Sequence, residues 1–465
     1  MRQEPCRKKP CMDDSGGTPG APSAPGGLKD RLMTLKDSLL GAFGLMMVAV
    51  TLASALNYLF TIIMTRMLDA SGEFSSFNSL NSIFLIVIMG ALSVQTVITK
   101  YVAEFEVTGD REKVRLLLRR FSRWLLFLGG GVILLSVAAA WPLSSALHLD
   151  SPLFVVILGT SVAITMYLTL PNGLLQGEQR WLALGGAQMS VAGLRILFGV
   201  ALVAAGLGVY GALSAATIAG LLVAGVIIYI FRDMFRGPVS EDPAFRPSGA
   251  LKALIPVAVA IFLVIFMTQI DVVLVKALRG AAAADHYSYA AVAGKAVLFF
   301  PEGVSLVMFP RVSAMRERGE PTRGVLALSL GAATALVGVV VAFYAAFPAF
   351  TAKFFAGDKG KYVLDIKGPG GISFVALFGI VMAVFALVKL LAFYHLALDR
   401  KSFIVIYALA ACLQVAGIFL FHGTLPQVQV VMLVVGGVLL LVNLLLAFRE
   451  GAGPGFSDQA EMPIT

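Results

Sequence analysis

Long apolar runs separated by short polar segments make up most of the chain. Each run holds about 20 or more mostly apolar residues, which is the length an α-helix needs to cross a hydrocarbon core of roughly 30 Å. Charged residues, glycine and proline mark the ends of the runs. They predict about twelve membrane-spanning helices, near residues 40–66, 73–100, 122–147, 152–176, 181–205, 208–231, 252–279, 285–311, 323–352, 371–396, 402–422 and 426–448.

The composition agrees with lipid as the main solvent. Hydrophobic residues make up 58% of the 465 positions and charged residues only 14%. An ordinary soluble domain is about 45–50% apolar and about 25% charged. We therefore expect an all-α polytopic membrane protein.

Basic residues give the chain a formal net charge of +9, and they gather in alternate connections between the runs. They are dense before the first span and again in Lys100–Arg123, Arg232–Lys252 and Arg311–Arg323. Loops rich in Lys and Arg stay on the cytoplasmic side of a membrane. Both termini are thus predicted to be cytoplasmic. The charge is explained by topology and by contact with anionic membrane lipids, without a nucleic-acid partner.

The ends of the chain lack apolar runs. Residues 1–39 are predicted to form a disordered basic tail that finishes in an interfacial helix, because Leu28, Leu32 and Leu35 recur at helical spacing among charges. Residues 449–465 are expected to form a second cytoplasmic tail.

The two halves of the chain are weakly similar. A shift of 213 residues places Phe74-Ser75 on Tyr287-Ser288 and lays the first two spans over the seventh and eighth. Six spans separate the copies, so the repeat is parallel, with its pseudo-twofold axis along the membrane normal. The predicted division is a six-helix lobe at 40–231, a cytoplasmic linker at 232–251 and a six-helix lobe at 252–448.

Five ionisable residues fall inside the predicted spans. Arg195 and Lys295 lie near mid-membrane, where an uncompensated cation costs several kcal/mol or more, so we expect them to face an internal chamber. Asp271 lies at a depth comparable with Lys295 on the next span, and an ion pair between them is expected. Glu302 follows Lys295 on the same helical face, and Lys389 is close enough to the inner end of its span to reach the headgroups.

Neutral amides accompany these charges. Such side chains either line a hydrated cavity or join helices by hydrogen bonds worth roughly 0.6–2 kcal/mol, and both interpretations stay open for each residue. The amides are Asn57, Asn78, Asn81, Gln95, Gln188 and Gln269.

The sequence offers no sign of a cofactor. It contains no GxxxxGK[ST] phosphate loop, and its four histidines lack the spacing of metal ligands. The three cysteines are interpreted as free thiols. We expect neither an enzyme nor a metal site, and any energy source would be a proton or sodium gradient.

Several short segments, in this order along the chain, carry a family resemblance. The chain resembles the multidrug/oligosaccharidyl-lipid/polysaccharide exporter superfamily, in particular the polysaccharide-biosynthesis and O-antigen-type flippases of bacteria. The segments are Thr65-Arg66-Met67-Leu68, Gly72-Glu73-Phe74-Ser75, residues 174–180 (LLQGEQR), 206–212 (GLGVYGA), 269–275 (QIDVVLV), 287–291 (YSYAA) and Phe309-Pro310-Arg311.

The resemblance implies a V-shaped pair of lobes in the bacterial cytoplasmic membrane that moves polyprenyl-diphosphate-linked sugars to the outer leaflet. Other polysaccharide-assembly proteins would be its partners. Lys295, with Pro301 six residues later, is similar to the arginine that the eighth helix supplies in lipid II flippases. The chain departs from those flippases at Leu59-Phe60, where they carry an Arg-Asp pair, which argues against lipid II as cargo.

Our hypothesis from the sequence is a flippase for a lipid-diphosphate-linked oligosaccharide. Lys295 and Arg195 would neutralise the diphosphate, and the amides would contact sugar hydroxyls. Asp271 and Glu302 are the candidates for coupling to protons or sodium.

Two alternatives remain open. A cation-coupled multidrug exporter is expected to have an anionic rather than a cationic cavity. A membrane-embedded polymerase or glycosyltransferase usually presents a large outer loop, and the largest candidate here is Lys353–Gly370.

Overall fold

The structure, a computed structural model, describes residues 39–69, 72–232 and 248–450. The predictions for the N-terminal tail, most of the linker and the C-terminal tail therefore fall almost wholly outside the described residues.

The described residues are almost entirely helical, which confirms an all-α polytopic membrane protein. Within them the only extended pairing is an isolated bridge between Lys367 and Ser373. The α-helices are α2 (Leu39–Met67), α3 (Glu73–Thr108), α4 (Arg111–Ala146), α5 (Leu153–Gly177), α6 (Trp181–Leu202), α7 (Gly208–Ile230), α9 (Ser248–Lys295), α10 (Glu302–Glu317), α11 (Arg323–Ala346), α12 (Pro348–Ala356), α13 (Lys361–Leu364), α14 (Phe374–Ala397), α15 (Phe403–Leu420) and α16 (Leu425–Glu450).

Ten helical runs among the described residues are long and apolar enough to span a membrane. Two of them, Trp181–Ile230 with 50 residues and Ile255–Glu317 with 63, are at least twice as long as one crossing needs. Each is interrupted by a glycine with non-helical backbone, at Gly206 (φ 87°) and Gly280 (φ 73°). Each long run thus holds two crossings, and the ten runs correspond to the twelve predicted spans.

Several predicted boundaries are wrong by up to eleven residues, for physical reasons. The third span was expected to begin near 122, but α4 begins at Arg111, because hydropathy marks the membrane and a charged helix continues beyond it. The ninth was expected to reach 352, but α11 ends at Ala346. Phe347 leaves the helical region (φ −127°, ψ 56°), and Pro348 starts the separate short helix α12.

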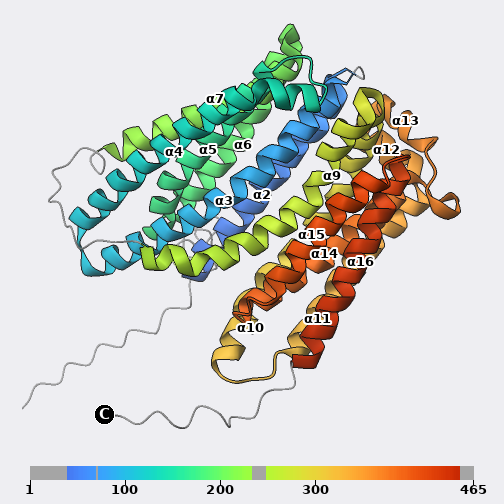
Figure 1. The fold of residues 1–465 in the computed structure, drawn as a ribbon. Helices are drawn as coiled ribbons and strands as arrows, with labels where there is room; N and C mark the ends of the chain where they lie inside the picture. Colours follow the sequence, from blue (N-terminus) through green and yellow to red (C-terminus); the bar gives the residue numbers. More distant parts are fainter. Residues whose placement is uncertain (1–38, 70–71, 233–247, 451–465) are drawn as a thin grey trace, which may run out of the picture.

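The helices form two groups. Helices α2 to α7 pack against one another, as do α9, α11 and α14 to α16. Figure 1 shows the first group in blue to green and the second in yellow to red, with α9 lying along the seam. The contact between the groups is made mainly by α3 against α9. Near α12 and α13 the groups lie close together, and α10 lies at the opposite end.

The helix that carries Lys295 ends at that residue. A short 3-10 turn, Ala296–Phe299, follows, and Pro301 precedes the first turn of α10. Proline has no backbone N–H and cannot continue the hydrogen-bond ladder of the helix before it. Lys295 therefore sits at a backbone break, next to the close packing of α9 on α14.

Gly294, beside Lys295, is predicted to be intolerant of a side chain. A Cβ there would lie 2.3 Å from the Phe378 ring, so we expect Gly294→Ala to lower the free energy of unfolding by about 1–3 kcal/mol. Gly303→Ala is the matched control, because a Cβ there meets nothing within 4 Å. Thermal unfolding in detergent measures both, and equal stabilities would contradict this packing.

Candidate functional site

Arg195 on α6 is held by two amides. Its Nη1 donates to Asn57 Oδ1 at 3.1 Å and its Nη2 to Asn81 Oδ1 at 3.0 Å. The guanidinium also lies 4.4 Å from the centroid of the Phe60 ring. Among the described residues no carboxylate pairs with it, and its buried Nε–H has no acceptor. Dipoles and an aromatic face therefore solvate this cation, and its full charge remains.

Lys295 forms the expected ion pair. Its Nζ lies 3.1 Å from Asp271 Oδ1 and donates to Gln269 Oε1 at 3.0 Å. The other Asp271 oxygen accepts from the Tyr287 hydroxyl at 2.8 Å, and Gln429 Nε2 donates to that hydroxyl at 2.5 Å. Lys295, Asp271, Tyr287 and Gln429 are all buried. The lysine charge is thus balanced by a carboxylate that has a second partner of its own.

Neighbouring residues of α3 connect the two cations. Asn81 binds Arg195, and the next residue, Ser82, donates from Oγ to Gln269 Oε1 at 3.2 Å. The same Gln269 oxygen accepts from Lys295. Two adjacent α3 residues therefore make polar contacts to α6 on one side and to α9 on the other, across the seam between the two helix groups.

The other predicted site residues are placed differently. Glu302 forms an ion pair with Lys389. Asn78 is buried on α3, and its amide nitrogen has no partner among the described groups. Gln188 lies on α6 two turns before Arg195, hence on the same helical face. Gln95 bonds Gln176 and joins two helices.

Sequence reasoning missed Tyr287 and Gln429. Tyr287 was noticed in the internal repeat and as a family marker but not as a site residue, and Gln429 lies in the last apolar run, where a glutamine is itself unusual. Buried amides in such runs need partners, which is a signal that could have found it. Within the described residues no group of three or more His, Cys, Asp or Glu could hold a metal ion.

Comparison with solved structures places the fold. An inward-facing multidrug-resistance MATE family transporter of the MOP superfamily superposes with a TM-score of 0.71 at 14% identity, covering 85% of this chain and 94% of that one. An outward-facing MATE transporter of the same superfamily gives 0.61 at 14%, covering 90% and 97%. A MATE structure in the straight conformation gives 0.62 at 16%, covering 90% and 98%. The chain has the MATE fold.

The sequence alone is less informative in such comparisons: no family model and no curated protein matches it. The MATE neighbours are described as transporters, and they have been captured in inward-facing and outward-facing conformations. The TM-score of this chain is higher against the inward-facing structure.

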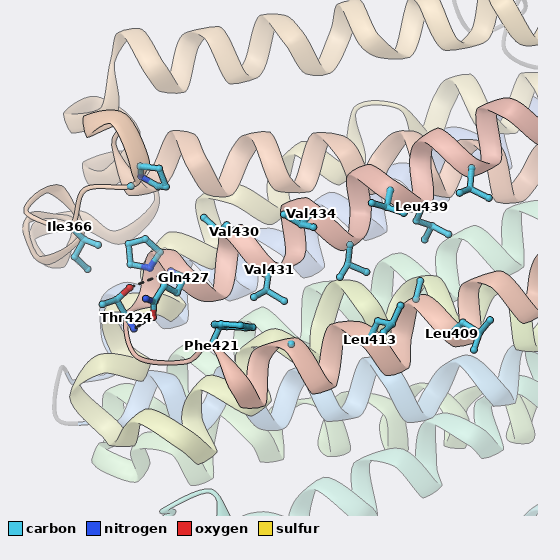
Figure 2. A pocket seen from close by; sticks show the side chains of 18 of the residues that line it. Ile366, Leu409, Leu413, Phe421, Thr424, Gln427, Val430, Val431, Val434 and Leu439 are labelled. Atoms are coloured by element: carbon cyan, nitrogen blue, oxygen red, sulfur yellow. Dashed lines mark hydrogen bonds between the residues drawn. The ribbon is translucent and has the colours of Figure 1, made fainter.

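A large apolar groove in this MATE fold lies apart from the cations. It runs between α15 and α16, has a volume of about 1180 Å³, and is lined by neither Arg195 nor Lys295. Figure 2 shows Leu409 and Leu413 facing Val431 and Val434 across it. Its mostly aliphatic lining suits a hydrocarbon chain, and neither cation reaches it, so the groove is not the centre of the polar site.

Removing one partner of the Lys295–Asp271 pair is predicted to lower the free energy of unfolding strongly. Replacing both partners by neutral residues is predicted to lower it much less. Asp271→Asn leaves a buried ammonium without its counter-charge and should lower the free energy of unfolding by about 3–5 kcal/mol. Adding Lys295→Gln should restore much of the loss. Asp399→Asn is the control, since its contact with Arg316 is 3.8 Å long and exposed, and should cost no more than about 1 kcal/mol. Unfolding in detergent measures all three, and additive losses in the double variant would contradict the pairing.

Proposed function

We propose that the protein is an alternating-access carrier that moves an amphiphilic anion, a lipid-diphosphate-linked oligosaccharide, from the inner to the outer leaflet. The observation that carries this proposal is the uncompensated charge of Arg195. Asp271 balances Lys295, whereas the described residues that bind Arg195 are neutral, so the centre has a net positive charge. A buried cation of this kind is costly unless an anion visits it.

The geometry of Arg195 suits a phosphate. A guanidinium presents a planar fork of donors that matches phosphate oxygens in pairs. Its Nε–H has no acceptor, and its two Nη atoms are held by carboxamides, which are weaker acceptors than a phosphate. A diphosphate can therefore displace Asn57 and Asn81 and leave their amides free for sugar hydroxyls.

Lys295 would supply the second charge. When its ammonium turns to the diphosphate, Asp271 keeps the Tyr287 hydroxyl as a partner. The carboxylate can then take up a proton or a sodium ion, so this exchange is our candidate for coupling to an ion gradient. Glu302, paired with Lys389, would remain a secondary candidate.

The rest of the cargo needs two other environments. Asn78, Gln188 and Gln269 would contact sugars together with the released amides, and the polyprenyl tail would stay in hydrocarbon, to which the groove between α15 and α16 is suited. Such cargo belongs to the bacterial cytoplasmic membrane, where polysaccharide-assembly proteins would supply and consume it, with both termini of the chain cytoplasmic.

A multidrug exporter is the second candidate, because the solved neighbours are multidrug-resistance transporters. Cationic drugs require an anionic chamber, and the one acid bonded at this centre is already neutralised by Lys295. The sign of the charge therefore favours an anionic cargo.

Removing either cation is predicted to stop transport. Arg195→Gln and Lys295→Gln should each slow flipping of a fluorescent polyprenyl-diphosphate sugar in proteoliposomes by roughly tenfold or more, since each loses a charged hydrogen bond to the cargo. Lys401→Gln removes an exposed charge at the end of the bundle and should flip normally. Wild-type rates in well-folded Arg195→Gln and Lys295→Gln would refute these roles.

Ligand stabilisation distinguishes the two candidate functions. A soluble short-chain polyprenyl diphosphate at a hundredfold excess over its Kd should stabilise the purified protein by about 2.7 kcal/mol, and Arg195→Gln should abolish the effect. An ethidium-like cation should not stabilise it. The reverse pattern in thermal unfolding would favour the drug exporter.

A further inference from the structure

The corner between α2 and α3 has unsatisfied helix ends on both sides. The last carbonyl groups of a helix and the first N–H groups of the next have no partners within their own helices. They also carry the negative and positive ends of the helix dipoles. In this chain, charged residues from the second helix group complete both ends of the corner.

Asp285 caps the start of α3. Its Oδ2 accepts from the Gly72 N–H at 2.7 Å and its Oδ1 from the Ser75 N–H at 2.8 Å. Gly72 has φ 102°, and a Cβ there would lie 2.8 Å from Ala281 Cβ, so only glycine suits the position. The carboxylate is buried, only 1% exposed. Bonds from two backbone N–H groups to one carboxylate are among the stronger hydrogen bonds in proteins.

One lysine binds the start of α3 and a second lysine binds the end of α2. Buried Lys276 donates to Gly72 O at 3.3 Å and to Ser75 Oγ at 3.0 Å. Lys359, in the 3-10 turn after α12, donates to Thr65 O at 3.2 Å and to Leu68 O, at the end of α2. Partial burial lowers the pKa of Lys359, and the nearby carboxylates, Asp69 first, act against that shift.

The location of the contacts made by Asp285, Lys276 and Lys359 indicates their role. They join the two helix groups at the end marked by α12 and α13, opposite α10 (Figure 1). That end is the outer side in the predicted topology. Polar contacts suit an interface between helix groups that must open. When the groups separate, the helix ends and charges regain hydrogen bonds from water, so the net free-energy cost of separation is modest.

The contact between Gly72 and Asp285 also lies close to the pseudo-twofold axis that relates the two copies of the sequence repeat. Gly72 and Asp285 are 213 residues apart, which is the offset between the two copies. A residue touches its own repeat equivalent only where the pseudo-twofold axis passes close by. Phe74 stacks on Tyr289 next to this point, with ring centroids 5.4 Å apart. The contacts of the α2–α3 corner with the second helix group therefore lie where two rocking lobes would pivot or separate.

We propose that Asp285, Lys276 and Lys359, clasping the α2–α3 corner, form the outer gate of the carrier. The clasp holds the lobes together in the inward-facing state, and its release gives the outward-facing state. This inference rests on the alternating access proposed above, but it does not depend on the identity of the cargo.

The test measures the distance between the lobes without any substrate. Spin labels on cysteines replacing exposed Ser145, at the end of α4, and exposed Lys361, at the start of α13, report it by pulsed electron resonance in lipid nanodiscs. The three native cysteines are first changed to serine. Asp285→Ala removes two charge-assisted hydrogen bonds and should raise the ratio of long to short distances by roughly tenfold or more.

Lys359→Gln is the second variant, because Lys359 is only partly buried and its loss spares the core. It should raise the same ratio, though by less. Asp365→Asn and Lys353→Gln remove exposed charges at the same end and should leave the distances unchanged. Unaltered distances in well-folded Asp285→Ala and Lys359→Gln would overturn the gate. A shift in distance without flipping of lipid diphosphate would instead keep the gate and reject the cargo.

Discussion

The compensation of charge inside a bilayer constrains this structure more than any other interaction. Each buried ionisable group must find a partner, because hydrocarbon supplies none. Lys295 forms an ion pair with Asp271, and the Asp271 carboxylate accepts a hydrogen bond from the Tyr287 hydroxyl. Among the described residues, Arg195 contacts two side-chain amides and an aromatic ring instead of a carboxylate. The difference between the two cations leaves a site with spare positive charge, and the proposed anionic cargo follows from it.

Helix α3 links this site to the joint between the lobes. Its first residues are capped by Asp285, and Asn81 and Ser82 follow Gly72 by nine and ten residues, or ~14 Å along the axis. A displacement of α3 relative to α9 therefore alters the clasp and the Gln269 contact together. The MATE neighbours adopt inward-facing and outward-facing conformations. In the proposed transport cycle, α3 would couple occupancy of the centre to opening at the outer end.

The sequence predicted those features that depend on periodicity and depth along one helix. The spans and the Asp271–Lys295 pair follow from hydropathy and from residue counts within neighbouring helices. The partners of Arg195 were identified as polar residues but not as its ligands, because their contact joins positions more than a hundred residues apart. The pairing of Glu302 with Lys389 was not foreseen for the same reason. Asp285 was missed because a carboxylate near a predicted loop is indistinguishable from a solvated one.

Access of water to the two cations tests the central claim most directly. Single cysteines at positions 195 and 295, in a chain whose native cysteines are replaced by serine, can be exposed to a membrane-impermeant thiol reagent from each side. Our account predicts that both react from the cytoplasmic side, because water reaches the chamber around them from that side. Cysteines that stay unreactive from both sides would contradict a chamber around Arg195 and Lys295 and with it the carrier mechanism.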